Sequence, residues 1–383
     1  MKITVAIDSF KGSLSSLEAG RAAREGIRRV FPSAEIQVRP LADGGEGTVR
    51  TLTAGLGGRL CTVEASDPLG RPRSCQYGIL ETPQKTAVIE MAEAAGLTLI
   101  DAGQASILDA STFGVGELIR DAIAKGCRRF LIGLGGSATN DGGIGMLQAL
   151  GYEILDENHA PVPRGARGLS RIASISGRTA MPELTECTFR VACDVDNPLC
   201  GPRGCSAVFG PQKGAGPDLI PRLDQWLSAF HQTARTIRPA GDPAFPGRGA
   251  GGGMGGAVRT FLNASLEPGA RLILEETGLP ALIRASDLVV TGEGRLDGQT
   301  AMGKAPIAVA RNARDAGRPV IAFSGCVAKD AGVCNDAGID AFFPILRSVT
   351  TLEDALSSDN AFRNLADTAE QVFRLIRAVS PQP

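Results

Sequence analysis

Histidine and aromatic residues are scarce in this chain. Its 383 residues include two histidines, one tryptophan and two tyrosines, and aromatic residues make up only 4 %. The two histidines, His159 and His231, are far apart in the sequence, so we expect neither a Ser-His-Asp triad nor a structural zinc site. His231 lies close to Trp226 and beside Phe230, which favours a packing role over a catalytic one.

A surplus of charge and a long apolar run are both missing. Lysine plus arginine number 40 and aspartate plus glutamate 41, a formal net charge of -1, with no long block of either sign. Nucleic-acid-binding proteins usually carry a basic surplus or stripe, so we expect no nucleic-acid partner. No segment approaches the ~20 apolar residues of a membrane span, so we expect no membrane partner either.

The nine cysteines form no Cys-x-x-Cys pair, and their number is odd. Neither a disulfide framework nor a zinc ribbon is therefore indicated, and we expect free thiols in a reducing compartment. The first residues, MKITVAIDSFKGS, contain an apolar stretch too short for the core of a signal peptide. We expect a cytoplasmic protein.

Glycine, by contrast, is abundant. There are 49 glycines in 383 residues, about 13 %, against an average of ~7 %. They have no triplet period, and 43 % of the residues are hydrophobic, which excludes a collagen-like or disordered chain. The length predicts two or three domains. The excess of glycine is thus a feature of a globular protein and calls for a local explanation.

Short runs rich in β-branched residues alternate with segments of helical periodicity. The runs predict strands at 3–8, 35–40, 86–91, 129–134, 188–193, 287–291, 319–324 and 340–346. Helices are predicted after a cap at Ser15 or Ser16, near 113–125, at about 302–316, and from Phe362 to Ile376.

This alternation predicts an α/β fold with mostly parallel sheets. We expect a discontinuous, doubly wound domain of the Rossmann or flavodoxin type, formed by residues 1–60 and 285–383. A second α/β domain, residues 61–284, would be inserted into it, with the active site in the cleft between the two domains.

Five of the predicted strands are followed by polar loops, most of them rich in glycine. The loops are DSFKGS (8–13), LADGGEGT (41–48), GGSATNDGGIG (135–145), DVDNP (194–198) and GEGRLDGQTAMGK (292–304). In open parallel sheets, ligands bind beyond the carboxyl ends of the strands. Glycines let backbone N–H groups surround an anion, and the many carboxylates beside them need a divalent cation if that anion is a phosphate. The pattern therefore favours a nucleotide bound with Mg²⁺.

Standard nucleotide-binding motifs do not fit well. GQTAMGKA (298–305) matches G-x4-G-K, but Ala305 replaces the Ser or Thr that would hold Mg²⁺. GGGMGG (251–256) matches G-x-G-x-x-G through low complexity alone and follows no convincing strand.

Taken together, the loops resemble those of the type-1 glycerate kinase family. The resemblance rests on DSFKGSLS, PLADGGEGT, DPLGRP (67–72), GLGGSATNDGG, CDVDNPL (193–199), GCSAVFGPQKGA (204–215) and TGEGRLDGQTAMGKAP (291–306). These motifs span nearly the whole chain in the family's order. GRGAGGGMGGA (247–257) departs from the alanine-containing pattern expected there, at Arg248 and Met254.

The resemblance implies ATP-dependent phosphorylation of D-glycerate at its 2-hydroxyl, giving 2-phosphoglycerate. The implied partners are glycerate and ATP, with Mg²⁺ as the metal. The sequence leaves the oligomeric state open, a homo-oligomer included.

The loops also supply candidates for each role in phosphoryl transfer. Asp194 or Asp196 would orient or deprotonate the hydroxyl or hold Mg²⁺, and Lys11 would meet the glycerate carboxylate or the phosphate. The candidates for nucleotide binding are Gly135, Gly136, Ser137, Thr139, Asn140, Gly142, Gly294 and Lys304. Those for substrate binding are Ser9, Lys11, Asp43, Arg71 and Arg295, and those for the metal are Asp194, Glu293 and Asp297.

Other functions stay open at this point. A kinase of the same architecture could form 3-phosphoglycerate or act on another small hydroxy acid. A protein of a different class would bind a small organic acid as a sensor, although such a ligand gives no reason to gather so many carboxylates. An NAD-dependent dehydrogenase ranks third, because a sound G-x-G-x-x-G context and a plausible catalytic histidine are both missing.

Overall fold

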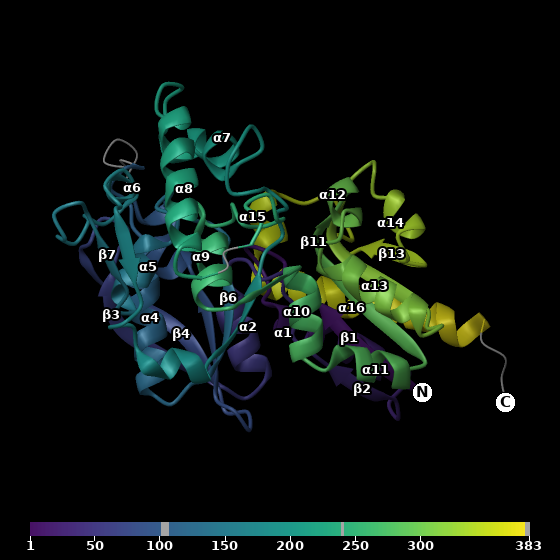
Figure 1. Ribbon diagram of the computed structural model, residues 1–383. Helices are drawn as coiled ribbons and strands as arrows, with labels where there is room; N and C mark the ends of the chain where they lie inside the picture. Colours follow the sequence, from purple (N-terminus) through teal and green to yellow (C-terminus); the bar gives the residue numbers. More distant parts are fainter. Residues whose placement is uncertain (101–106, 239–240, 380–383) are drawn as a thin grey trace. The chain divides into compact units, whose positions relative to one another are not determined.

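The structure is a computed structural model that describes residues 1–100, 107–238 and 241–379 (Figure 1). The chain forms two compact units. Unit 1 contains residues 1–43, 54–56 and 270–383, and unit 2 contains residues 44–53 and 57–269. Compared with the predicted domains, these units assign 44–53 and 57–60 to the inserted part and 270–284 to the discontinuous part.

Unit 1 is built on a parallel sheet of five strands in the order β13-β12-β11-β1-β2. Its strands are β1 (Lys2–Ile7), β2 (Glu35–Val38), β11 (Leu288–Leu296), β12 (Val320–Val327) and β13 (Ala341–Pro344). Its helices are α1 (Ser16–Val30), α10 (Gly269–Glu276), α11 (Leu279–Ala285), α12 (Gly298–Ala301), α13 (Ala305–Asp315), α14 (Val333–Asp336), α15 (Leu352–Leu356) and α16 (Ser358–Val379). Numbered within the unit, the strand order is 2-1-3-4-5, as in flavodoxin-like folds.

The two faces of this sheet are covered by different helices (Figure 1). Successive side chains of a strand point to opposite faces. Thus Ile3 and Val5 of β1 pack in a cluster with α1 and α16, whereas Ala6 packs in a second cluster with α11 and α13. The predicted doubly wound α/β arrangement is confirmed.

Unit 2 contains a mixed sheet of six strands in the order β10-β9-β6-β5-β4-β3. Its strands are β3 (Arg59–Ser66), β4 (Pro72–Leu80), β5 (Thr86–Glu90), β6 (Arg129–Gly133), β9 (Thr188–Ala192) and β10 (Ser265–Glu267). From β5 to β10 the pairing is parallel, and β4 and β3 continue the sheet in antiparallel fashion. A separate antiparallel pair is formed by β7 (Glu153–Leu155) and β8 (Ser174–Ser176).

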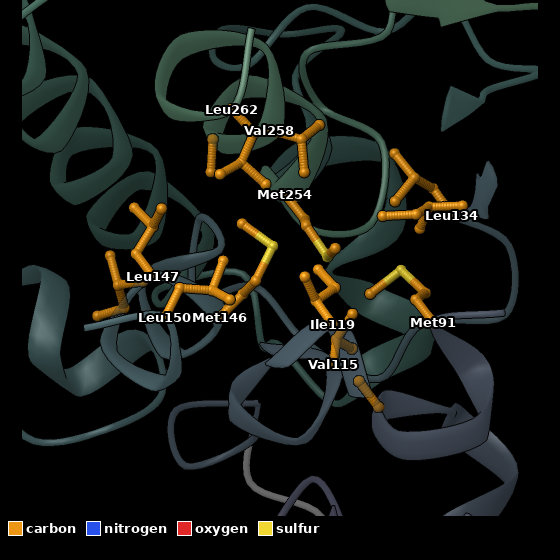
Figure 2. Close-up of a cluster of buried hydrophobic side chains, with 14 of the residues drawn as sticks. Met91, Val115, Ile119, Leu134, Met146, Leu147, Leu150, Met254, Val258 and Leu262 are labelled. Carbon is orange, nitrogen blue, oxygen red and sulfur yellow. The ribbon is translucent and has the colours of Figure 1, made fainter. Parts of the chain in front are cut away.

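The helices of unit 2 surround this sheet. They are α2 (Thr48–Gly55), α3 (Ala92–Ala95), α4 (Phe113–Ala124), α5 (Ile144–Ala149), α6 (Ala166–Leu169), α7 (Cys205–Phe209), α8 (Ile220–Arg235) and α9 (Met254–Phe261). Single turns of 3-10 helix lie at Leu97–Leu99, Pro182–Glu186 and Pro211–Lys213. Figure 2 shows the buried core in which Val115 and Ile119 of α4, Met146 of α5 and Met254 and Val258 of α9 gather.

Most predicted elements form within a few residues of their expected ends. The strand predicted at 287–291 continues to Leu296, so Glu293 lies on β11 and not in a loop. The hairpin of β3 and β4 was not predicted, because its strands carry many polar residues and no long β-branched run. Ser15 is the cap of α1, in a reciprocal pair with Glu18, and all nine cysteines are free thiols as expected. No helix in the described part of the chain is long and apolar enough to cross a membrane.

Helices α1 and α16 touch along their backbones at a glycine. A Cβ placed on Gly26 of α1 would clash with the carbonyl oxygen of Ala366 and lie 2.9 Å from Ala369 Cβ. Both neighbours belong to the buried face of α16. The close approach therefore depends on the missing side chain at position 26.

We expect Gly26→Ala to lower the free energy of unfolding by about 2 kcal/mol, because overpacking forces these helices apart. Urea denaturation measures the change. Gly332→Ala is the matched control, since a Cβ there meets nothing within 4 Å, and its effect should stay within about 0.5 kcal/mol. Equal losses in both variants would contradict this account of the helix contact.

Candidate active site

A cavity of about 230 Å³ lies within unit 2, beyond the carboxyl ends of β6 and β9. Its lining combines backbone-rich loops with a few polar side chains. The lining residues are Gly44, Gly45, Leu97, Leu134, Gly135, Gly136, Ser137, Ala192, Cys193, Asp194, Val195, Phe209, Gln212, Lys213, Ala250 and Gly251. This is the edge of the sheet at which the sequence predicts ligand binding.

The loop that follows β6 presents three of its residues to the cavity. Gly135 and Gly136 are exposed, and Ser137 is largely buried beside them. The loop is tied to α3 and the turn after it, because Leu97 N–H donates to the Gly136 oxygen and Ala138 N–H donates to the Ala95 oxygen. These hydrogen bonds fix the conformation of the loop. The backbone of the exposed glycines can therefore contact a ligand in the cavity without rearranging.

The next residues of the same loop point into the protein. Thr139 Oγ1 donates to the Gly251 oxygen at 3.4 Å, and Asn140 Nδ2 donates to Ser206 Oγ at 3.0 Å. Thr139 and Asn140 are fully buried. The loop residues expected to bind the nucleotide therefore fall into two groups. The cavity is lined by Gly135, Gly136 and Ser137, whereas the protein interior contains Thr139, Asn140 and Gly142, which hold the loop in place.

A buried carboxylate organises the end of the loop. Asp141 Oδ2 accepts hydrogen bonds from the Thr112 backbone at 2.8 Å and the Thr112 hydroxyl at 2.9 Å, and Oδ1 accepts from Gly143 N–H at 3.0 Å. Gly145 N–H also points to Oδ2, at 3.3 Å. Complete burial raises the pKa of Asp141, while these donors lower it. The carboxylate thus joins the loop and the start of α5 to the start of α4.

The glycine-rich tract at 247–257 packs directly on this loop. Gly252 has a φ of +66°, and a Cβ there would clash with the Thr139 carbonyl oxygen. Gly142 N–H in turn donates to the Gly252 oxygen at 3.0 Å. Any side chain at position 252 would therefore push the tract away from the loop. The low-complexity tract is a structural support of the cavity.

Lys213 reaches the cavity from the motif GPQKGA. Its Nζ donates to Ser137 Oγ and to the Thr139 carbonyl oxygen, both at 2.8 Å. Burial lowers the pKa of this ammonium group to about 8. Lys213 is the buried cation of the site, and its sequence signal was the lysine in the family motif at 204–215.

The two aspartates expected to be catalytic differ in their surroundings. Asp194 lines the cavity, and its Oδ1 accepts from Gly269 N–H at 2.8 Å. Asp196 is exposed and pairs with the exposed Arg203 at 3.0 Å. Only Asp194 therefore faces the cavity that the glycine loop lines.

A second group of candidates lies in unit 1, at the carboxyl ends of β1 and β11. Gly294 approaches the DSFKGS loop so closely that a Cβ on it would lie 3.2 Å from Phe10 Cα and 3.4 Å from Lys11 N. Ser9 N–H donates to Asp8 Oδ1 at 2.7 Å. In a sheet of this order, the strands β1 and β11 flank the topological switch point, where flavodoxin-like proteins bind their ligand.

Carboxylates accumulate at this point of unit 1. Burial and the nearby Asp43 raise the pKa of Asp8 to about 7, and Glu293 adds to the rise while Lys11 opposes it. Burial likewise raises the pKa of Glu293. Asp8 was missed at the sequence level, although it begins the DSFKGS motif. The signal that could have found it is its position directly after a buried strand.

The remaining candidates of unit 1 are occupied by local structure. Asp297 caps α12 and accepts from the N–H groups of Gln299 and Thr300. Arg295 lies 3.4 Å from the Asp297 carboxylate, and Lys304 lies 3.9 Å from Glu293. The GQTAMGKA segment is thus a capped helical turn followed by α13.

Arg71 belongs to the turn of the β3–β4 hairpin in unit 2. Its Nε donates to Asp67 Oδ2 at 2.6 Å, and Asp67 Oδ1 also accepts from the N–H groups of Leu69 and Arg71. Backbone and side-chain hydrogen bonds lower the pKa of Asp67 against the effect of its burial. DPLGRP is therefore a turn closed by its own ion pair.

The expected metal ligands are divided between the units, because Asp194 belongs to unit 2 and Glu293 and Asp297 to unit 1. Within the described residues, no group of three His, Cys, Asp or Glu side chains is arranged to hold a metal ion. Mg²⁺ does not need such a group, since it usually takes one or two carboxylates together with phosphate oxygens. Asp8, Asp43 and Glu293 repel one another, and a cation bound to their oxygens would relieve this repulsion.

A largely parallel α/β fold with a glycine-rich loop beside a buried lysine is suited to an enzyme that binds a phosphate-bearing small molecule. The glycerate kinase family model matches residues 3–377 of the chain. The chain is 44 % identical to glycerate kinase from Haemophilus influenzae over 381 residues, which cover 98 % of the chain and 99 % of that protein. It is 42 % identical to glycerate 2-kinase from Escherichia coli K12, with 96 % and 98 % covered.

The fold is similar to a solved structure as well. The crystal structure assigned to glycerate kinase 2 from Salmonella typhimurium LT2 matches with a TM-score of 0.91 and 42 % identity, over 99 % of this chain and 98 % of that one. The chain therefore belongs to the glycerate kinase family. The resemblance that its loops indicated is confirmed, and so is the prediction of a kinase.

We expect Asp141→Asn to lower the free energy of unfolding by about 2 kcal/mol, because an amide nitrogen replaces an oxygen that accepts hydrogen bonds inside the protein. Thermal denaturation followed by circular dichroism measures the change. Asp156→Asn is the control, since Asp156 accepts the same kind of backbone bonds in an exposed turn. Similar stabilities of D141N and the wild type would show that the buried carboxylate does not hold the loop.

Proposed function

We propose that this protein transfers the γ-phosphoryl group of ATP to the 2-hydroxyl of D-glycerate, giving 2-phosphoglycerate and ADP. The observation that carries the proposal is the cavity at the end of β6 and β9, where exposed glycine backbone, a buried lysine and an aspartate meet. Backbone N–H groups and a lysine suit phosphate oxygens, and an aspartate suits the proton of an alcohol. Membership of the glycerate kinase family supports glycerate as that alcohol.

Different residues of the cavity have different roles in phosphoryl transfer. Gly135, Gly136 and Ser137 hold the phosphate chain of ATP through their N–H groups and the Ser137 hydroxyl. The substrate hydroxyl gives its proton to the Asp194 carboxylate as its oxygen forms the new bond to phosphorus. The bond between the γ-phosphorus of ATP and the oxygen that links it to the β-phosphate breaks, and ADP leaves with the electron pair.

The carboxylates of unit 1 are suited to the metal. Glu293, with Asp8 and Asp43, would hold Mg²⁺, a cation that would supply positive charge for phosphate oxygens. Lys11, whose charge acts on Asp8, and Ser9 beside it are suited to the glycerate carboxylate. Asp297 has a different task, because it caps α12.

The proposed activity is tested by mixing the protein with ATP, Mg²⁺ and D-glycerate and measuring ADP. Phosphorus NMR identifies the product, because a phosphate on C2 couples to one proton and gives a doublet, whereas one on C3 couples to two and gives a triplet. We expect the doublet, and no ADP when EDTA removes the metal. Binding of glycerate without any release of ADP would support the sensor instead, and a triplet would mean that the 3-hydroxyl is the acceptor.

The two aspartates of the DVDNP loop provide a matched pair of variants. We expect Asp194→Asn to lower kcat at least about 100-fold, because it removes the proton acceptor that lines the cavity. Asp196→Asn should stay within about threefold of the wild type, since that side chain is exposed and pairs with Arg203. Steady-state kinetics at saturating ATP compare them. Near-normal kcat for D194N would remove Asp194 from the mechanism.

A further inference from the structure

We propose that Lys213 is a catalytic residue whose ammonium group binds a phosphate oxygen in the cavity beside Gly135, Gly136 and Ser137. The phosphate belongs either to the nucleotide or to the phosphorylated product. This inference rests on the proposed function, since it names the side chain that would bind a phosphate in that reaction. The sequence offered Lys213 only as one of several cations that could bind a phosphate or a small carboxylate, without assigning it to a site.

The burial of Lys213 is unusual for its residue type. The residue is only 4 % exposed, whereas lysines are almost never fully buried unless they are paired. It lies in the turn Pro211–Lys213, which ends at Gly214 in the left-handed conformation with a φ of +92°. A surface lysine would leave its ammonium group in water. Here the backbone turn directs it to the inner wall of the cavity.

The hydrogen bonds of Lys213 leave its charge uncompensated. An ammonium group has three N–H donors, and two of them go to neutral acceptors, Ser137 Oγ and the Thr139 carbonyl oxygen. In the part of the chain that the structure describes, Lys213 forms no ion pair. Burying a charge without a counter-charge is costly, so the missing partner is an anion that enters the cavity.

The charged and titratable groups around Lys213 do not supply that partner. Asp141 raises the pKa of Lys213 through space, but its two oxygens accept hydrogen bonds from Thr112, Gly143 and Gly145. Cys205 is a buried thiol whose pKa burial raises to about 11, so it is neutral at physiological pH. Asp194 lines the same cavity and holds Gly269 N–H.

The geometry of Ser137 fits the same ligand. Its oxygen accepts from Lys213, so its own hydrogen is free to point to another acceptor. Lys213, the Ser137 hydroxyl and the backbone N–H groups of the exposed residues Gly135 and Gly136 then offer one set of donors to a ligand in the cavity. Lys213 stays protonated throughout and transfers no proton. A carboxylate would also be an anion, but the glycine backbone beside the lysine favours the larger oxygen shell of a phosphate.

Three variants separate the charge of Lys213 from its packing. Lys213→Gln keeps donors near Ser137 and Thr139 but removes the charge, Lys213→Arg keeps the charge, and Lys85→Gln removes a half-exposed lysine elsewhere in unit 2. Isothermal titration calorimetry measures the binding of ADP and of 2-phosphoglycerate to each. We expect K213Q to weaken at least one ligand about 10- to 100-fold, K213R to restore much of it, and K85Q to match the wild type.

The pH dependence gives a test on the unmodified protein. Because burial lowers the pKa of Lys213 to about 8, its charge is present below that pH and lost above it. The affinity of the wild type for the ligand that K213Q weakens should therefore fall above about pH 8. In K213R this fall should vanish, because arginine does not titrate in this range.

The outcomes distinguish this inference from the proposed function. Loss of ADP binding in K213Q assigns the lysine to the nucleotide, and loss of 2-phosphoglycerate binding assigns it to the transferred group. Unchanged binding of both, or a wild-type affinity that is flat from pH 7 to 9, would overturn the inference even if the wild type phosphorylates glycerate. If the wild type releases no ADP with glycerate while K213Q loses ADP binding, the proposed function fails and the phosphate site stands.

Discussion

The cavity of unit 2 depends on one close contact between two stretches of backbone. Gly252 lies against the carbonyl of Thr139. Any other residue at this position would displace the loop that contains Thr139. This contact holds the loop after β6 in a fixed shape, and Gly142 completes it by donating to the Gly252 oxygen. Because the loop is fixed from below, its upper residues, Gly135 to Ser137, can present backbone and hydroxyl donors to a ligand.

Two buried charges act on this loop, and their surroundings give them different roles. Asp141 is buried with a full set of donors, so its charge is used within the protein. Lys213 is buried with neutral acceptors alone among its hydrogen-bond partners, so its charge is directed to the cavity. The difference explains why one buried charge acts as a structural tie and the other is suited to a ligand.

The strand order of unit 1 places several carboxylates at the same edge of its sheet. Its strand order places β1 beside β11, although the whole of unit 2 lies between them in the sequence. Asp8 directly follows β1, and Glu293 lies on β11 at the same edge of the sheet, so burial, the nearby Asp43 and Glu293 all raise the pKa of Asp8. Burial makes this repulsion costly, which is the reason that a cation fits the donor set.

The sequence by itself determined the α/β class, the main strands and the glycine loops at their ends, because these depend on local periodicity and turn chemistry. It also determined the family, since seven motifs in order are a property of the chain alone. It could not tell that β11 extends through Glu293, because a polar strand end is stabilised by its neighbours and not by its own residues. Nor could it separate Gly135 from Asn140, since one faces the cavity and the other Ser206.

Only the tertiary structure assigned Lys213 to the cavity and Asp196 to the surface. Both are charged residues in glycine-bearing or polar motifs, and nothing in their sequence surroundings distinguishes them. Whether a charge is desolvated depends on segments distant in the sequence, as when the chain around residue 213 meets the loop at 137–139. Local sequence therefore specifies which groups are present, while long-range packing sets the dielectric environment in which they act.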